Sequence, residues 1–591
     1  MSPPSPSAPE ERPTEQLPGW LRLLLIGIAV AAGVAIALFP LHFIQKIGID
    51  VPVWEQWEFL PILEKSYSGG PWLREVFQPF FGHMVAVPML LFIGLSRLNG
   101  WNVMLEMYWG WLLVLGTGLL LARWLRPLRL PLVIKVVFWL CLALLVFELR
   151  ASELTLNGLN SGVFLCYFLV VASIELGRES QASWPRFLAM AVTGLLATWS
   201  WGAGLLIWPV GLLLLLHHAR GRWSRSAIWC AVAVVAASPY VIFKVDAGVA
   251  GQHDLSRMPR WFLNLLSAPF STEARTIPAA LLVPLAVAAV VVVARKALRA
   301  RAIPSEMLPW AALLSHGVLT ILLILYMRSV SPAFSPAFSR YAFVAVFPLV
   351  GFLGVGLLAV REVTEKTSVW LRRAAWGASA AVLLIVGGRT AFMSYQVYEM
   401  VSSWQPVRAA LDTFMRRAPE YATEGQFLAV VQMREDLLEA GLPMLKRWHL
   451  GPYRRASGAP LLPLEEWLAR GTQAEDLELG VSHSVQMGED HLDIWGWAVD
   501  RQGSQPAEFV AASAEGKILE QALTELGSSP GAPGTDPARN IYGWRMVIPA
   551  TKLRALGDPR KLELVAFTKD GRTRRIPLPL PEGLRVAATS P

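Results

Sequence analysis

The sequence contains few cysteines and few charged residues for its length. Three of its 591 residues are cysteines, and each lies inside an apolar run, at Cys141, Cys166 and Cys230. We therefore expect neither a disulfide framework nor a cysteine-based metal site. Charged residues make up 16% of the chain and hydrophobic residues 54%, whereas soluble domains carry about 25% charged residues. Such a chain cannot cover itself with polar surface, so we expect most of it to lie in lipid.

Several motifs of soluble enzymes and of nucleic-acid-binding proteins are also missing. The net charge is +9, but the Lys and Arg residues form no stripes on a polar chain, so we predict no nucleic-acid partner. In a membrane protein such an excess usually belongs to cytoplasmic loops. We find no P-loop, no GxGxxG motif after a strand and no HExxH motif, which argues against nucleotide-driven and zinc-dependent hydrolytic classes.

Eleven apolar runs predict a multi-pass α-helical membrane protein with about 11 transmembrane helices, because a crossing needs about 20 apolar residues. The runs lie at residues 20–40, 103–123, 131–148, 161–176, 186–200, 203–217, 225–245, 277–296, 308–328, 340–360 and 369–390. A further run, 83–98, begins with His83, contains Pro88 and ends near Arg97. We interpret it as a re-entrant or interfacial helix on the outer face, with a twelfth span as the alternative.

Clusters of basic residues predict the orientation of these spans. They lie at residues 123–135, 220–225, 295–301 and 361–373, and they alternate correctly if all four face the cytoplasm. Residues 1–18 are rich in Pro, Ser and Glu and predict a disordered cytoplasmic tail. No small-residue cleavage site follows the first run, so we interpret it as a retained span. The N-terminus is then cytoplasmic and the C-terminal domain extracytoplasmic.

The domain boundaries follow from changes in composition along the chain. Residues 19–392 form the predicted transmembrane domain, with a first external loop at 41–102, and residues 393–478 a helical extracytoplasmic linker region. From 479 to 582 the pattern becomes strand-like, as in His491–Asp500, and indicates a β-sandwich. Together, 393–582 are a C-terminal extracytoplasmic α+β region. We expect Trp495, Trp497 and Trp544 in its core; the alternative is an aromatic surface for stacking sugars.

The first external loop carries the candidate catalytic residues. Asp50, Glu55 and Glu58 lie beside Trp54 and Trp57 at the expected bilayer surface, where a carboxylate could act as a general base or hold a divalent cation. On a helix Glu55 and Glu58 share one face. The alternative is an amphipathic helix whose tryptophans anchor it at the lipid headgroups.

Two further external connections and the start of a late span supply candidate substrate-binding residues. The first connection, 150–160, contains Arg150, Glu153 and Asn157; Arg150 and Glu153 could equally pair with each other. Trp201 lies in a glycine-containing turn at 200–204, which packing alone could also explain. Residues 339–341 open the late span, and an arginine there can grip a phosphate or simply extend to the interface; the candidates are Arg340 and Tyr341.

The order of these features resembles the GT-C superfamily of polyprenyl-phosphate-dependent membrane glycosyltransferases, in particular a poorly characterised bacterial branch. That branch has a W-D-E-W-D-like first loop, an H-N-E-H-R-like segment, a G-L-x-x-W-P turn and a late R-Y. The corresponding residues here are 54–58, 80–84, 204–209 and 340–341. The C-terminal Gly496–Asp500 segment resembles a G-W-A-x-D β-domain found on some bacterial cell-surface glycan enzymes.

The resemblance implies an inverting transferase in the bacterial inner (cytoplasmic) membrane. Its sugar arrives on a polyprenyl phosphate, and its acceptor is an extracytoplasmic glycan, lipid or protein. Carried over, Glu55 is the first choice of base, followed by Asp50 and Glu58. The resemblance also implies that His83 lines the same cavity and that Arg340 meets the leaving phosphate. No cofactor is certain, and a divalent cation is one option.

Three departures from the family pattern leave other classes open. Gly82 replaces the acid of the second motif, Met84 replaces its arginine, and Gln56 replaces a carboxylate of the first loop. One alternative is therefore a non-catalytic GT-C-like scaffold in cell-surface polysaccharide assembly. The other is a transporter of lipid-linked glycans, for which we would expect inverted repeats and charged mid-span helices.

Overall fold

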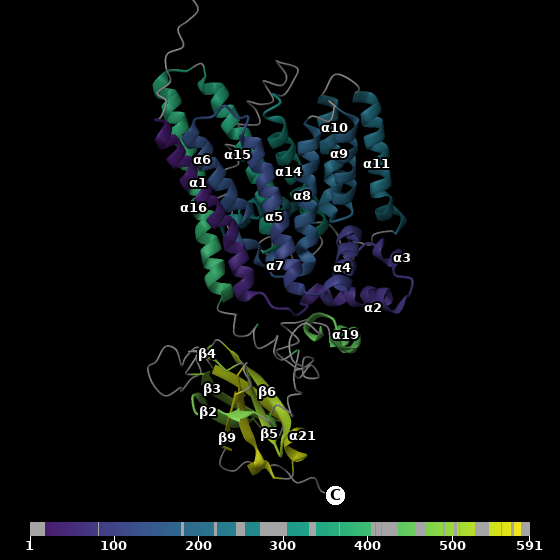
Figure 1. Cartoon of the computed structure of the whole chain (residues 1–591), viewed down its shortest axis with the longest axis vertical. Coiled ribbons are helices and arrows are strands. Elements are labelled where there is room, and N and C mark those ends of the chain that lie inside the picture. Colours follow the sequence, from purple (N-terminus) through teal and green to yellow (C-terminus); the bar gives the residue numbers. More distant parts are fainter. Residues whose placement is uncertain are drawn as a thin grey trace, which may run out of the picture.

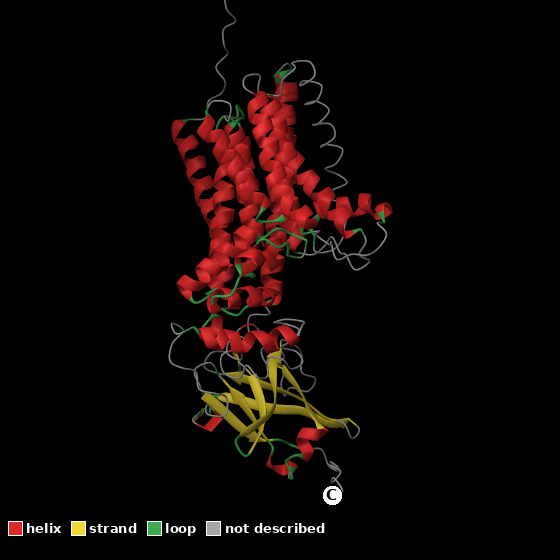
Figure 2. Cartoon of the chain, turned by 90° about the vertical axis from the view of Figure 1, so that its right-hand side faces the viewer, coloured by secondary structure: helices red, strands yellow, loops and turns green. Residues whose placement is uncertain are grey.

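The computed structural model is mostly helical, with strands confined to the C-terminal part (Figures 1 and 2). It describes residues 18–80, 82–178, 183–217, 222–243, 254–271, 304–329, 339–365, 367–402, 408, 415, 435–454, 468–469, 471–487, 491–500, 505–507, 509–525, 543–556, 558–568 and 572–580. The predicted tail at 1–17 and the predicted span at 277–296 lie outside the described residues.

Long helices form a bundle whose axes run in roughly the same direction (Figure 1). The bundle helices are α1 (Gly19–Ile47), α5 (Val103–Leu125), α6 (Leu132–Val146), α8 (Ser161–Gly177), α9 (Trp184–Thr198), α10 (Ile207–His217), α11 (Arg222–Ile242), α14 (Leu308–Arg328), α15 (Arg340–Thr364) and α16 (Val369–Ser402). Each corresponds to one of the predicted apolar runs. Within the described residues, eight helical segments are long and apolar enough to cross a membrane. The chain is therefore that of a multi-pass membrane protein.

The remaining described helices are short and lie mostly at one end of the bundle. They are η1 (Trp54–Phe59), α2 (Leu60–Ser68), α3 (Leu73–Val76), α4 (Ala86–Asn99), η2 (Leu149–Ala151), α7 (Ser152–Thr155), η3 (Gly158–Asn160), η4 (Gly202–Leu206), η5 (Leu255–Arg257), α12 (Met258–Leu266) and η6 (Ala268–Phe270). The ambiguous run 83–98 corresponds to α4. Its 14 residues extend about 21 Å at 1.5 Å per residue, less than the hydrocarbon core of roughly 30 Å.

Polar contacts between helix ends mark the end of the bundle opposite to these short helices. The Trp124 indole on α5 donates to Glu175 on α8 at 2.8 Å, and Arg123 pairs with the same carboxylate at 3.0 Å. Arg361, near the end of α15, pairs with Glu306 just before α14 at 2.7 Å. Both α5 and α15 begin at the first loop, where Val103 meets Asp50 and Arg340 meets Glu55, so Arg123 and Arg361 in their last turns lie at the opposite end of the bundle.

Helix α15 occupies the centre of the bundle, and most of its side chains are buried on every side. It packs against α14 at glycines that leave no room for a side chain. A Cβ on Gly351 would lie 2.5 Å from the backbone nitrogen of Leu314, and one on Gly317 would lie 2.6 Å from that of Pro348. Small residues of this kind let helix backbones approach closely where lipid offers no hydrophobic driving force.

The C-terminal strands form one hydrogen-bonded path in the order β1-β9-β8-β5-β6-β7-β3-β2, with β4 paired to β3. They are β1 (Thr472–Gln473), β2 (Leu477–Met487), β3 (His491–Asp500), β4 (Gln505–Pro506), β5 (Phe509–Ala514), β6 (Lys517–Glu525), β7 (Gly543–Pro549), β8 (Glu563–Phe567) and β9 (Arg572–Pro577). All pairs are antiparallel except β1–β9. Two short helices, α21 (Ala550–Arg554) and η11 (Pro559–Lys561), separate β7 from β8.

The core of this sheet region contains only one of its three predicted tryptophans. Trp544 is 2% exposed and packs with Ile494 and Ala498 of β3. Trp495 and Trp497 are partly exposed. Because side chains alternate along a strand, these two lie on the face opposite to Ile494 and Ala498, so their assignment to the core was wrong. Trp544 packs closely on β3, where a Cβ on Gly496 would lie 2.2 Å from its ring.

The predicted linker region, 393–478, contains structure that packs on the bundle. Helix α16 continues to Ser402, well past the predicted end at 390, and α19 (Glu435–Trp448) is followed by the short turn η8 (Gly451–Tyr453). In Figures 1 and 2, α19 lies between the strands and the end of the bundle that carries α2 and α4. The first loop and the sheet region therefore share one end of the molecule.

Candidate functional site

The first loop places Glu55 on a short 3₁₀ turn whose buried residues hold its shape. Trp54 adopts a left-handed conformation, with φ of 52°, which is uncommon for a bulky residue. Gln56 is buried and its side-chain oxygen accepts from the Val53 amide at 3.0 Å. The buried Trp57 indole donates to the Pro52 carbonyl at 2.9 Å. Glu55 is thus partly exposed on a turn that the buried Gln56 and Trp57 hold in place.

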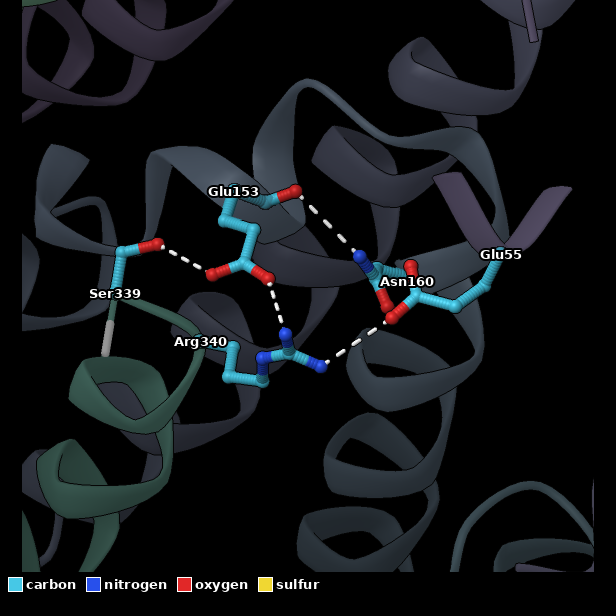
Figure 3. Close-up of polar contacts among 5 residues, drawn as sticks. All are labelled: Glu55, Glu153, Asn160, Ser339 and Arg340. Atoms are coloured by element: carbon cyan, nitrogen blue, oxygen red, sulfur yellow. Dashed lines mark hydrogen bonds and ion pairs between the residues drawn. The ribbon is translucent and has the colours of Figure 1, made fainter. Parts of the chain in front are cut away.

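Arg340 brings Glu55 together with a second carboxylate from a distant part of the chain (Figure 3). One guanidinium nitrogen of Arg340 lies 2.9 Å from Glu153 and another lies 3.4 Å from Glu55. The Ser339 hydroxyl donates to the other Glu153 oxygen at 2.9 Å. The Asn160 amide donates to the Glu153 backbone carbonyl at 3.4 Å (Figure 3).

The geometry of this cluster is asymmetric. Glu153 is held by two short contacts, from Arg340 and Ser339, and its side chain is 15% exposed. Glu55 is held by one longer contact and is 29% exposed. Glu153 therefore fixes the guanidinium, while the Glu55 end of the bridge is the more open to exchange with another anion.

Arg340 is the first residue of α15, where a positive charge is unfavourable for the helix itself. The N-terminus of a helix carries a partial positive charge and unpaired amide groups. A guanidinium there adds to that potential, and both attract anions. The carboxylates of Glu55 and Glu153 offset this charge in the present structure. An anion that binds Arg340 therefore has to displace the Glu55 contact, which is the longer of the two.

His83 lies close to Arg340 and to Arg328, the last residue of α14. It forms a two-residue bridge with Phe80, made possible by Gly82 at φ of 78°. Its ring stacks on Trp201 with centroids 3.9 Å apart, and a Cβ on Gly202 would approach its Nδ1 to 2.7 Å. Burial, together with the positive charges of Arg328 and Arg340, lowers the pKa of His83 to about 4. His83 is therefore neutral at physiological pH.

Two of the predicted first-loop carboxylates have different surroundings. Asp50 is 7% exposed; it accepts from the Val103 amide at 2.9 Å and pairs with Arg454 at 2.8 Å. These contacts give Asp50 a structural role and do not support its prediction as a second base. Glu58 is partly exposed, and three residues per turn in a 3₁₀ helix place it on the same side as Glu55.

Three of the predicted substrate-binding residues are buried. Arg150 is 6% exposed and donates to the Ser271 carbonyl at 3.3 Å. Asn157 is 2% exposed and caps η3 by accepting from the Leu159 amide at 3.1 Å. Tyr341 is 8% exposed and belongs to the core of the bundle. Their surroundings are those of structural residues, whereas Glu153, Trp201, His83 and Arg340 lie at the cluster.

Asn160, Ser339 and Arg328 were not predicted as members of the site. Asn160 and Ser339 lie within segments that were recognised as external connections, but nothing in the sequence distinguishes Asn160 from the buried Asn157. Arg328 ends α14 and has the pattern of an ordinary charged residue at a span boundary. Its proximity to His83 depends on how α14 packs.

No metal centre is found in the described ranges, where no three or more His, Cys, Asp or Glu side chains are grouped closely enough to hold an ion. The protein contacts of Glu55, Glu153 and His83 account for their positions. A scan against protein-family models gives no match, and searches of curated proteins and of solved structures find no similar chain.

Proposed function

We propose that this protein is an integral-membrane glycosyltransferase that moves a sugar from a polyprenyl-phosphate donor to an extracytoplasmic glycan, lipid or protein acceptor. One observation carries the proposal. A partly exposed carboxylate, Glu55, shares a guanidinium with Glu153 at the N-terminus of a bundle helix. A general base beside a phosphate-binding cation is the pair of groups that such a transfer needs.

The roles of the residues follow from their positions. The Glu55 carboxylate takes the proton of the acceptor hydroxyl, whose oxygen attacks the anomeric carbon with inversion. The bond from that carbon to the phosphate oxygen breaks, and its electron pair leaves with the polyprenyl phosphate. Arg340 and the N-terminus of α15 stabilise the departing negative charge. Glu153 and Ser339 hold Arg340, and neutral His83 lines the site.

The topology that we propose has eleven crossings, a cytoplasmic N-terminus, and the first loop and C-terminal region outside a bacterial inner membrane. Basic residues at the Arg123 and Arg361 end of the bundle support this orientation. The short α4, and the position of the first loop and sheet at the opposite end, support eleven crossings. In proteins with one cysteine introduced at Ser2 or at Ser590, a membrane-impermeant reagent added outside the cell is expected to modify only the second.

We also propose that the C-terminal sheet is a β-sandwich. The β6–β7 pairing is limited to Thr524–Trp544 and Glu525–Gly543, so the sheet can fold at this point. Buried side chains from β3 and β7 on one part of the path and from β5 and β8 on the other pack into one hydrophobic cluster. Two layers facing a shared core account for this packing.

The direct test is substitution of Glu55 by Gln in purified protein reconstituted into lipid vesicles. The assay measures release of polyprenyl phosphate from a panel of polyprenyl-phosphate hexoses and pentoses in the presence of cell-envelope glycans. Glu55→Gln should abolish release and leave the thermal unfolding temperature unchanged. The matched control is Glu64→Gln, because Glu64 is an exposed carboxylate on α2 that pairs with Arg447 at 3.3 Å. Release by Glu55→Gln equal to that of an active wild type contradicts the role of Glu55 as the base, and absence of release by the wild type favours the scaffold.

A transporter of lipid-linked glycans is the second candidate, and two buried carboxylates favour it. Glu106 and Glu148 are 4% and 5% exposed, and one oxygen of each has no hydrogen-bond partner among the described residues. Each lines a separate small pocket of the bundle. Ionisable groups at membrane depth commonly mark transport pathways. A transporter is expected to lose glycan export in Glu106→Gln or Glu148→Gln and to retain it in Glu55→Gln.

A further inference from the structure

Residues 435–454, which follow the last described helix of the bundle, pack directly on the first loop. Helix α19 has its Gly441 against the first-loop residues Leu60 and Trp57. A Cβ on that glycine would lie 2.4 Å from the Leu60 side chain and 3.0 Å from the Trp57 ring. Glycine costs about 1 kcal/mol relative to alanine inside a helix. This close contact explains its presence.

The turn after α19 is joined to the start of α5 through the backbone. The Gly451 amide donates to the Gly100 carbonyl at 2.8 Å. Both glycines have positive φ, 56° and 68°, and so do His449 and Trp101 beside them, at 53° and 56°. Four left-handed residues at one contact restrict its conformation, because non-glycine residues rarely adopt this region. The backbone therefore meets the first loop in one defined arrangement.

A buried ion pair completes this contact. Arg454 lies 2.8 Å from the second oxygen of Asp50, and their side chains are 18% and 7% exposed. The first oxygen of Asp50 accepts from the Val103 amide. Asp50, which precedes Glu55 by five residues, therefore ties Arg454 to the start of α5. Removing one partner of an ion pair this well buried strongly destabilises the folded protein, because the other charge is left buried and uncompensated.

We infer that Arg454 is a positioning residue for Glu55, and that the segment 435–454 sets the geometry of the candidate base. The inference rests on the proposed function for its catalytic meaning. Arg454 and α19 contact Asp50, Trp57 and Leu60, which precede and follow Glu55 along the chain. Trp57 is 0% exposed, so a shift of α19 displaces the turn. A displacement of about 1 Å at a catalytic group costs around 10²-fold in rate.

The contact also reaches the C-terminal sheet. Ala511 of β5 and Phe567 of β8 belong to the same buried cluster as Trp57, Leu445 and Met89. The sheet is thereby connected through α19 to the loop that bears Glu55. The C-terminal region is consequently part of the candidate site's support, although it lies more than four hundred residues away in the sequence.

The test measures amide hydrogen exchange of the full chain in lipid nanodiscs, with three variants at the contact and one control. Arg454→Ala and Asp50→Asn remove the ion pair, and Arg454→Lys keeps its charge without the planar fork. The control Arg447→Ala removes an exposed pair on the same segment. We expect exchange in peptides covering 51–59 to rise about tenfold in Arg454→Ala, and to rise less in Arg454→Lys. Peptides of α8 and α14 should be unchanged in all four.

Under the proposed transferase activity, Arg454→Ala should lower kcat at least tenfold with little change in KM, and Arg454→Lys should recover part of it. The inference is overturned if amide exchange in peptides covering 51–59 of Arg454→Ala stays within twofold of wild type. It is also overturned if exchange in these peptides rises as much in Arg447→Ala as in Arg454→Ala. If Arg454→Ala does not fold, the same comparison of Asp50→Asn with Arg447→Ala decides. Absence of transferase activity in the wild type refutes the proposed function and leaves the exchange result to judge the positioning role.

Discussion

Substitution of Arg340 by alanine separates a structural role of the guanidinium from a catalytic one. The two ion pairs of Arg340 have nitrogen–oxygen distances of 2.9 and 3.4 Å, and its side chain is 40% exposed. Ion pairs with this much solvent contribute about 0.2 to 1 kcal/mol each. Glu153 keeps its hydrogen bond from Ser339 in the variant. The free energy of unfolding should therefore fall by only about 1 kcal/mol.

The effect on turnover should be much larger. A positioned donor that stabilises developing negative charge is typically worth about 10²- to 10³-fold in kcat, or about 3 to 4 kcal/mol. Arg340→Ala should thus lower release of polyprenyl phosphate in the vesicle assay by at least 10²-fold. Arg340→Lys should fall between wild type and Arg340→Ala, because an ammonium keeps the charge but cannot bridge in the same way.

Two results would refute this reasoning. Turnover of Arg340→Ala within twofold of wild type shows that the cation does not meet the phosphate. A loss of more than about 3 kcal/mol of stability, measured by denaturant unfolding in detergent, shows that any loss of activity reflects folding, since exposed pairs cannot supply that much. Arg447→Ala is the reference, because it breaks the exposed ion pair between Arg447 and Glu64. The atoms of that pair lie 3.3 Å apart, and neither residue belongs to the Arg340 cluster.

Three other predictions can be tested on the same protein. Glu153→Gln should lower kcat about tenfold, and Ser339→Ala should lower it less, because each loosens Arg340 without removing it. A kcat equal to that of the wild type in both variants would contradict this. Gly441→Val should lower the free energy of unfolding by about 1 to 3 kcal/mol through overpacking against Trp57, measured by denaturant titration. The lowered pKa of His83, about 4, means that the unfolded chain binds a proton more readily between pH 6.5 and 4. Stability from this residue is therefore full above pH 6.5 and is lost as the pH falls toward 4, by at most about 3 kcal/mol. His83→Gln should flatten this part of the curve of unfolding temperature against pH.

The positions of the bundle helices could be predicted from the sequence, because apolar length is a direct requirement of the bilayer. The predicted run 308–328 coincides with α14, and 103–123 falls two residues short of the end of α5. The end of α16 could not be predicted, since polar residues such as Thr390 and Ser394 end the apolar run, whereas the helix itself continues beyond it to Ser402.

The candidate site could be predicted only in part. Glu55 and Arg340 were each recognised within a separate motif, but the sequence does not show which residues their side chains contact. Asp50 and Glu55 are both acids beside tryptophans, and only packing buries Asp50 against Arg454 and leaves Glu55 exposed to Arg340. Likewise, packing buries Asn157 and leaves Asn160 partly exposed beside Glu153. Long-range contacts such as Gly441 with Trp57 follow from the tertiary arrangement, not from periodicity along either segment.

The burial of α15 has a mechanical consequence for the two charges at the site. Of the residues in the apolar stretch of α15, 89% are buried. Arg340 is therefore attached to a helix that its neighbours restrain on every side. Glu55 lies instead on six residues of 3₁₀ turn. In the function that we propose, movement that accompanies binding and release of the lipid phosphate is therefore expected at Glu55 more than at Arg340. Arg340 is fixed by the bundle, whereas the position of Glu55 depends on the contacts of residues 435–454 with the turn and with Asp50.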